Sequence, residues 1–291
     1  MTSLLGISPS TPLGYDYAAW RDFIGRLEDA CGKGEVQTVL RLLDSGNPPY
    51  DQTLYDFLLS ATCDSSIRAA YGRYGFEGYA QTATLLMDRG ADPNARTQGE
   101  RTHFFSPLIL AVANSHVELS RLLLARGASV NAYGPSSSLY HQPALVVACG
   151  DHVYNHDSAV DLALLLLDQG ADIHLPDSFN GRTPLHEACR VSIQEKRQVY
   201  VVRKIRIARL LLERGAASDI YRKDKKGGTP LDVPYEPVAT HRRYLVQHPR
   251  MKAFLRKHFA ITVRKYVIGP PAEHPSRRIE HQAPLIASFL I

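Results

Sequence analysis

The sequence predicts an all-α solenoid, in which helix-turn-helix units stack in a row. Two observations predict this fold class. A leucine-rich phrase with a glycine after its leucines recurs along the chain, and a second phrase, with Pro at its second position in all four copies, alternates with it. Phrases that recur in a fixed order are the sign of a repeat architecture, because one such unit cannot bury its apolar face without a neighbour.

The leucine-rich phrase reads LLMDRGADPNA at 85–95, LLLARGASVNA at 122–132, LLLLDQGADIH at 164–174 and LLLERGAASDI at 210–220, with a weaker copy, LRLLDSGNPPY, at 40–50. The second phrase reads SPLILAVA at 106–113, QPALVVAC at 142–149, TPLHEACR at 183–190 and TPLDV at 229–233. Ahead of these, residues 20–30 and 35–43 predict the two helices of an N-terminal capping unit.

Each phrase has a physical reading. Proline is tolerated in the first turn of a helix, so the second phrase starts the first helix of a unit. Small residues such as Ala111 and Ala148 allow that helix to pack closely. Leu119 and Leu123 belong to the apolar stripe of the second helix, which Gly127 ends because glycine adopts the left-handed conformation easily. An extended finger then leads to the next unit.

These phrases resemble ankyrin repeats, whose signature is T-P-L-H-x-A at a period of about 33 residues. The segment TPLHEA at 183–188 fits every position of that signature, and the resemblance covers roughly residues 20–235. It implies about five or six units with β-hairpin fingers. It also implies a protein-interaction scaffold or adaptor, which binds its partner through a concave face made of fingers and first helices.

The spacing departs from the family pattern. The repeat glycines are 44, 37, 43 and 45 residues apart, and all four intervals exceed the family period. Ser106 and Gly127 keep the 21-residue spacing of an ordinary repeat. In the repeats that end at Gly90, Gly170 and Gly215, the extra residues are predicted to lie between the first and second helix. Insertions at one topological position are expected to project from one edge of the stack. One of them, YGRYGFEGY at 71–79, interleaves Gly with aromatic residues, which suits either contact with a peptide or base or folding over its own helices.

The ends of the chain do not follow the repeat. We predict an N-terminal extension over 1–19, ankyrin repeats over 20–235, a degenerate capping repeat over 236–260 and a non-repeat tail over 261–291. Helices are predicted at 241–247 and 250–258, and a strand at 263–268.

Composition limits the class of protein. Residues 1–189 contain 12 Lys/Arg and 21 Asp/Glu, whereas residues 190–291 contain 22 and 8, so the net charges are −9 and +14. This asymmetry favours an anionic partner. Four cysteines lie far apart, and with neither a signal peptide nor a membrane span evident, they predict reduced core thiols in an intracellular protein, cytoplasmic or nuclear.

Known catalytic motifs are missing from the sequence: it contains no P-loop, nucleophile elbow, zinc-protease or dinucleotide motif. His152 and His156 have metal-like spacing, but no third ligand follows them at a suitable distance. The expectation is therefore a non-enzyme without a catalytic residue, cofactor, metal or small-molecule substrate. His186 is expected to form hydrogen bonds between repeats.

Aromatic and arginine side chains are the usual anchors of protein interfaces, and several occur in the predicted fingers. The candidate partner-binding residues are Arg101, Phe104, Phe105, Tyr133, Tyr140, Phe179, Arg182, Tyr221, Arg222 and Lys223.

Two alternatives stay open. Segments 258–267 and 283–291 are faintly similar to a SOCS box, which would make the chain a substrate adaptor of a ubiquitin ligase, although the expected Cys-Arg and Leu-Pro-Leu-Pro are absent. The basic C-terminal third also suits electrostatic binding to nucleic acid or to an anionic membrane. Either its segment 190–226 contacts such a partner, or it is a solvated basic face.

Overall fold

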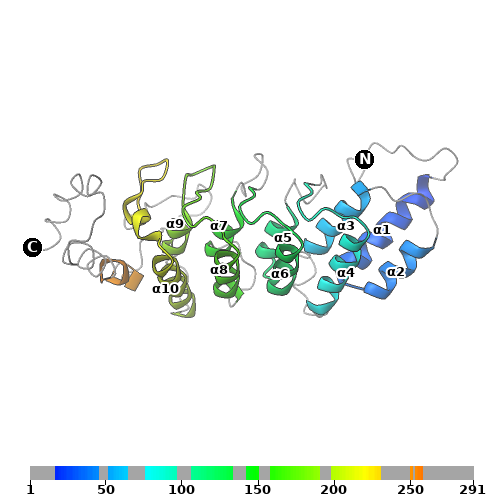
Figure 1. Cartoon of the computed structure of the whole chain (residues 1–291), viewed down its shortest axis with the longest axis horizontal. Coiled ribbons are helices and arrows are strands. Elements are labelled where there is room, and N and C mark those ends of the chain that lie inside the picture. Colours follow the sequence, from blue (N-terminus) through cyan, green and yellow to red (C-terminus); the bar gives the residue numbers. More distant parts are fainter. Residues whose placement is uncertain are drawn as a thin grey trace, which may run out of the picture.

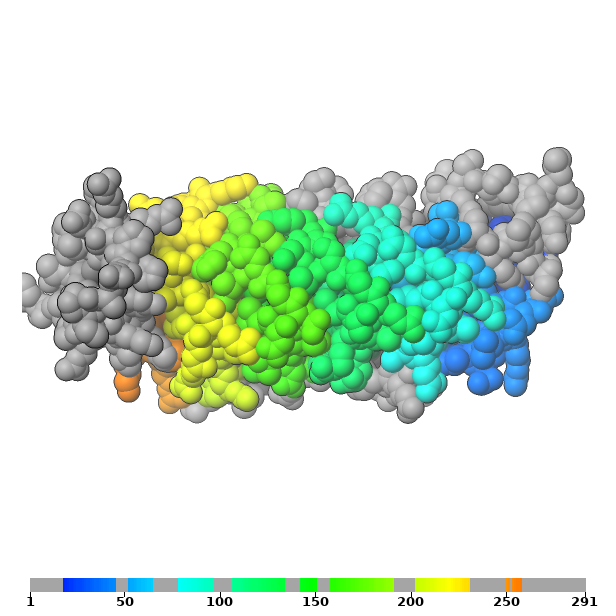
Figure 2. Space-filling model, in the orientation of Figure 1, coloured from blue at the N-terminus to red at the C-terminus, as the bar shows by residue number. Residues whose placement is uncertain are grey.

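Each pair of phrases folds into two helices that pack on the next pair, so the molecule is a row of repeats (Figure 1). The computed structural model describes residues 17–45, 52–64, 76–96, 106–133, 142–150, 158–190, 198–230, 250–251 and 253–257. Colours follow one another along the long axis in Figure 2, as expected when each repeat contacts its sequence neighbours.

Five helix pairs make up this part of the chain. They are α1 (Tyr17–Lys33) with α2 (Val36–Asp44), α3 (Gln52–Cys63) with α4 (Phe76–Asp88), α5 (Pro107–Ala113) with α6 (Val117–Ala125), α7 (Ala144–Cys149) with α8 (Ala159–Asp168), and α9 (Pro184–Cys189) with α10 (Gln198–Glu213). A short 3-10 helix, η4 (Ala216–Tyr221), follows. The all-α solenoid of about five or six units is confirmed.

The helix ends follow the local chemistry that the phrases predict. Ser106 caps α5: its Oγ accepts a hydrogen bond from Ile109 N at 3.4 Å, and Pro107 occupies the first turn. Gly127 has a φ of +89° where α6 ends, and Ala128 N donates to Leu123 O at 2.9 Å. This left-handed turn satisfies carbonyls at the end of the helix and starts the finger.

Leucines and small residues form one continuous core through the stack. Leu119, Leu123, Leu162 and Leu166 of the second helices have no exposed surface or almost none. Ala111, Ala148 and Ala188 of the first helices are also fully buried, and their small side chains allow α5, α7 and α9 to pack side by side. The four cysteines are buried free thiols. Burial raises the pKa of Cys31 to about 12, so this thiol is inert at neutral pH.

The helix bounds confirm where the extra residues lie. Only three residues separate α5 from α6, whereas longer segments separate α3 from α4, α7 from α8, and α9 from α10. The inserted residues 65–75, 151–157 and 191–197 lie outside the described part, so their common edge remains a prediction. One boundary was wrong: residues 76–79 belong to α4, and Tyr79 is buried with its ring 5.0 Å from that of His116.

A row of ion pairs ties consecutive second helices together. Arg89 contacts Asp44 at 2.7 Å, Arg126 contacts Asp88 at 2.8 Å, and the Arg214–Asp168 pair, also at 2.8 Å, links α10 to α8. Each Arg directly precedes the repeat glycine of its own repeat. Each Asp lies two residues before the repeat glycine of the preceding repeat. Between α6 and α8, Ala125 and Gln169 occupy the equivalent positions. Both partners of the ion pair are therefore missing at this one joint, and the row of ion pairs is interrupted there.

A second row of hydrogen bonds joins the fingers, which are the segments between a repeat glycine and the next first helix. Asn94 Oδ1 accepts from Ser129 N at 2.7 Å, Asn131 Oδ1 accepts from Asp172 N at 2.8 Å, and His174 Nδ1 lies 3.0 Å from Asp219 Oδ2. The expected β-hairpins are reduced: among the described residues, the fingers form one isolated bridge, Tyr133 with Pro143.

Helical residues near the C-terminus cover the last repeat. Residues 250–251 and 253–257 are helical, and Met251 and Leu255 are fully buried. The Arg209 guanidinium of α10 lies 5.7 Å from the centre of the Phe254 ring, within the range of a cation–π contact. The predicted helix at 241–247 and strand at 263–268 lie outside the described residues.

We expect the stability of the protein to fall on mild acidification because of His116. Burial lowers the pKa of its imidazole from 6.5 to about 4. Between these values the unfolded chain binds the proton and the folded chain does not, so lowering the pH favours unfolding. The loss between pH 7 and pH 5 is about 2 kcal/mol, at about 1.4 kcal/mol per pH unit. Urea denaturation across this range measures it.

A His116→Asn variant, which cannot titrate, is the control for this pH effect. It is expected to be less stable than the parent at pH 7 and to lose less on acidification. The burial of His186 lowers the pKa of that imidazole too, so some pH dependence will remain. Equal losses in parent and variant would show that His116 does not contribute.

Candidate functional site

The fourth and fifth fingers form the best-defined polar surface of the molecule, and each is closed by one aspartate. In the fourth finger, Asp177 Oδ1 accepts from Asn180 N at 2.5 Å and its Oδ2 accepts from Arg182 N at 2.8 Å. The backbone of Asp177 also donates to Arg182 O at 2.7 Å. Residues 177–182 are therefore a fixed turn, with Phe179 near its tip.

The fifth finger repeats this plan with Asp224. Its Oδ1 accepts from Lys226 N at 2.9 Å and from Gly228 N at 2.8 Å, while Asp224 N donates to Gly228 O at 2.8 Å. Both aspartates begin the pattern of an Asp, a glycine three or four residues later, and then Thr-Pro. The two fingers lie side by side above α9 and α10 (Figure 1).

Gly181 allows the two fingers to pack closely. Its φ is +71°, and a Cβ at this position would lie 3.1 Å from Lys225 Cγ. Lys225 N donates to Asn180 O at 2.8 Å, and Lys225 Nζ donates to Ser178 O at 2.6 Å. Arg222 adds a bond to His174 O at 2.8 Å. The fingers are therefore one rigid unit rather than two separate loops.

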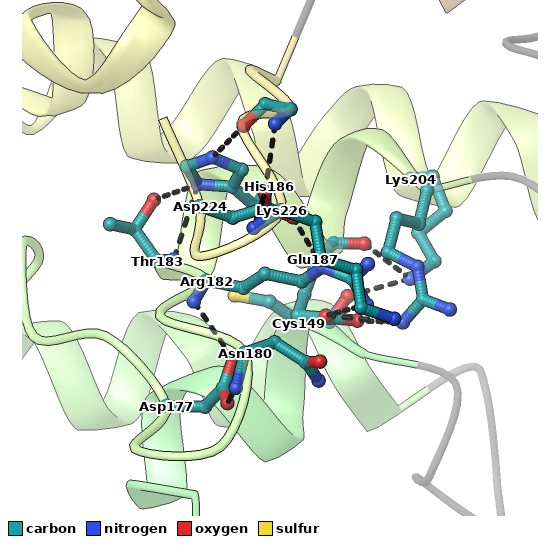
Figure 3. A network of polar contacts seen from close by, with 12 residues as sticks. Cys149, Asp177, Asn180, Arg182, Thr183, His186, Glu187, Lys204, Asp224 and Lys226 are labelled. Atoms are coloured by element: carbon teal, nitrogen blue, oxygen red, sulfur yellow. Dashed lines mark hydrogen bonds and ion pairs between the residues drawn. The ribbon is translucent and has the colours of Figure 1, made fainter. Parts of the chain in front are cut away.

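A buried ion pair joins the bases of the two fingers (Figure 3). Arg182 Nε donates to Asp224 Oδ2 at 3.1 Å, and the two side chains are 3% and 1% exposed. Glu187 lies 3.9 Å from the Arg182 guanidinium, but both of its carboxylate oxygens accept from Arg190, at 3.1 and 2.9 Å. Removal of one partner from a pair this deeply buried leaves an uncompensated charge.

Hydrogen bonds also determine which atoms of Asp224 and His186 carry a proton where the two fingers meet. Burial opposes ionisation of Asp224, but hydrogen bonds from Gly228 N, Arg182 and Lys226 N outweigh it and lower the pKa of the carboxyl. His186 Nδ1 accepts from Thr183 N at 3.2 Å, so its proton resides on Nε2, which lies 3.3 Å from Gly228 O. This arrangement agrees with the predicted structural role of His186.

Lys204 of α10 is fully buried and donates hydrogen bonds to the ends of two first helices. Its Nζ donates to Cys149 O at 2.7 Å and to Glu187 O at 2.9 Å, near the C-terminal ends of α7 and α9. In the third repeat, which has no insertion, Asn114 makes the equivalent bond to the preceding first helix. It donates to Cys63 O, at the end of α3, at 3.0 Å. Lys204 thus replaces a turn residue that the insertions displace.

The structure separates the predicted binding residues. Phe179 is 68% exposed, Arg222 and Lys223 are exposed, and Tyr221 is partly buried beside them. Tyr133 of the third finger reaches the fourth, where its hydroxyl donates to Pro176 O at 3.0 Å.

Arg101, Phe104, Phe105 and Tyr140 lie outside the described residues. Arg182 differs from the expectation, because its guanidinium is buried against Asp224 and is not available to a partner.

Charges of opposite sign are segregated across the paired fingers. In the fourth finger, residues 171–182, and the fifth, residues 216–229, three of the four carboxylates, Asp177, Asp219 and Asp224, are buried, and the fourth, Asp172, is exposed. The exposed cations there are Arg222, Lys223, Lys225 and Lys226. The paired fingers therefore expose four cations and one carboxylate, an excess of positive charge, beside one exposed aromatic ring.

The described segments contain neither a membrane-spanning helix nor a cluster of metal ligands. None of their helices has the length and apolarity that crossing a bilayer requires. Nor do these segments bring three or more His, Cys, Asp or Glu side chains together as a metal site would.

Comparison with known proteins agrees with this architecture. The ankyrin-repeat family model matches residues 103–134 and 180–225. Human transient receptor potential cation channel subfamily V member 5 is 33% identical over 144 residues, which are 46% of this chain and 19% of the channel. The ankyrin repeat and KH domain-containing protein CBG24701 of Caenorhabditis briggsae is 31% identical over 140 residues, 48% of this chain and 4% of that protein.

A solved structure shows the same fold. The human ASB11 ankyrin repeat domain superposes with a TM-score of 0.52 over 84% of each chain, at 23% identity. The chain therefore contains ankyrin repeats and has the fold of an ankyrin solenoid; such repeats are a protein-interaction module, and the fold is generally non-enzymatic. The matches span a fifth or less of the two curated relatives, so the similarity concerns the repeats and not those whole proteins.

Proposed function

We propose that the chain is an adaptor or scaffold that binds another protein through its finger and first-helix face, with the paired fourth and fifth fingers at the centre of the contact. One observation carries the proposal. Phe179 is 68% exposed, the highest value among the large apolar residues described, yet hydrogen bonds hold its turn in place. An aromatic side chain on a fixed backbone loses little conformational entropy on binding.

The test compares two exposed apolar side chains. Phe179→Ser removes the ring from the finger, and Val202→Ser removes a side chain that is 49% exposed on α10. Tagged full-length chains are used to capture partners from a lysate of the native source, with nuclease and moderate salt, and retained proteins are quantified by mass spectrometry. The Phe179→Ser chain is expected to lose, relative to the parent, the partner that the Val202→Ser chain retains.

Other results contradict this proposal. A partner lost equally from both variants, or lost only from the Val202→Ser chain, would place the contact elsewhere. Ubiquitin-ligase subunits such as elongins, retained by the parent and by both variants, would favour the SOCS-like segment at 258–267 and 283–291 instead. Retention that nuclease abolishes would favour nucleic acid.

A further inference from the structure

The charge pattern of the paired fingers indicates what kind of partner they fit. Four exposed cations lie within the five residues 222–226, with a buried carboxylate between them. That carboxylate, Asp224, is directed inward to Arg182 and to backbone N–H groups. It therefore compensates an internal charge and contributes little to the outer face, which remains strongly positive.

Two of the cations are bonded to the finger that carries the exposed ring. Lys225 Nζ donates to Ser178 O at 2.6 Å, and Ser178 precedes Phe179 in the chain. Arg222 bonds to His174 O at 2.8 Å, which places its guanidinium over the fourth finger as well. A ligand that contacts Phe179 therefore meets the ammonium of Lys225 at once, and both groups are already held in position.

Among the described finger residues, this group of cations lies at one end of the finger row. The described residues of the second and third fingers, 91–96 and 128–133, expose a single cation, Arg96. Nucleic-acid surfaces extend a basic track along successive phosphates and usually add several stacking rings. A compact group of cations around one ring instead fits a short protein segment with carboxylates on either side of an apolar side chain.

We infer that the tips of the fourth and fifth fingers, defined as Phe179 with Arg222, Lys223, Lys225 and Lys226, bind an acidic segment of the partner protein. This inference rests on the proposed function and specifies its chemistry. The partner's apolar side chain packs on Phe179, and its Asp and Glu side chains pair with the surrounding cations. Such pairs at an exposed site contribute most to the rate of association and to partner choice.

The experiment selects ligands without assuming their sequence. A displayed library of random dodecapeptides is panned against the full-length chain, and the enriched peptides are labelled for fluorescence anisotropy. We expect peptides with several Asp or Glu residues around an aromatic or large aliphatic one. Their affinity is expected to fall when NaCl is raised from about 50 to 300 mM, because salt screens exposed charges.

Matched variants locate the binding site. Lys223→Glu/Lys226→Glu reverses two finger charges, and Arg256→Glu/Lys257→Glu makes the same net change at exposed positions of the C-terminal helix, away from the fingers (Figure 1). The finger variant is expected to weaken binding at least about tenfold, and the control less than about twofold. Phe179→Ser is expected to weaken it about thirtyfold, as for a central anchor. Circular dichroism confirms that each variant is folded.

The inference is overturned if the enriched peptides lack acidic residues, if no peptide is enriched, or if both charge-reversal pairs weaken binding equally. Single-stranded DNA and phosphatidylserine vesicles are tested in parallel. The inference is also overturned if the finger variant weakens binding to these ligands alone and not to the peptides. Proteins captured through Phe179 would still support the proposed function after such a failure, so the two conclusions are tested separately.

Discussion

Replacing Asp224 with Ala is expected to lower the free energy of unfolding by about 4 kcal/mol, the typical effect of breaking a buried ion pair. The substitution leaves the Arg182 guanidinium, whose side chain is 3% exposed, without its hydrogen-bonded carboxylate. It also removes the carboxylate oxygen that closes the fifth finger by accepting from Lys226 N and Gly228 N. Urea denaturation followed by circular dichroism measures the loss.

Asp172→Ala is the matched control for this substitution. Asp172 is also a finger aspartate and accepts from His174 N at 2.9 Å, but it is exposed and belongs to none of the ion pairs described here. Its loss is expected to cost about 1 kcal/mol or less. Adding Arg182→Met to Asp224→Ala should recover part of the stability, since a buried charge without its partner is costlier than an apolar side chain. A loss below 1 kcal/mol for Asp224→Ala would contradict the argument.

Lys204→Met is expected to destabilise the protein by about 3 kcal/mol, through the loss of two hydrogen bonds from a charged donor in a buried site. The methionine preserves much of the volume but leaves Cys149 O and Glu187 O without this donor near the ends of α7 and α9. The negative end of each helix dipole loses a buried cation as well.

The control for Lys204 lies on the same helix. Arg206→Met also removes one positive charge from α10, but Arg206 is exposed and its loss is expected to change stability by less than about 0.5 kcal/mol. Hydrogen exchange supplies a second measurement. The last turns of α7 and α9 should lose protection in Lys204→Met and keep it in Arg206→Met. Equal protection in both variants would show that the ammonium does not stabilise these helix ends.

Much of the fold follows from short-range patterns. The apolar period, the prolines at the helix starts and the repeat glycines each act within one helix or turn, so most of the helix pairs and the places of the insertions were predictable. The start of α4 was missed because Gly78 and the aromatic residues near it are typical of a loop. Gly78 is instead needed for close packing, because a Cβ there would lie 2.3 Å from Gly34 O.

The buried polar residues depend on contacts distant in sequence. Arg182 was expected on the surface, since an arginine in a finger is usually solvated, and its burial depends on Asp224, 42 residues later. Lys204 was one of many cations in a basic segment. Helical spacing does place it on the face of Ile207, Ala208 and Leu211, which are all fully buried, and this signal could have identified it.

The interrupted row of ion pairs has a mechanical consequence. A stack in which each unit contacts only its neighbours transmits load through a series of joints, and its compliance is greatest at the joint with the fewest ties. Because Ala125 and Gln169 stand where the other joints have Asp and Arg, the joint between α6 and α8 lacks the ion pair that the other joints have. We therefore expect bending of the array to be easiest there, between the first three helix pairs and the repeats that carry the paired fingers.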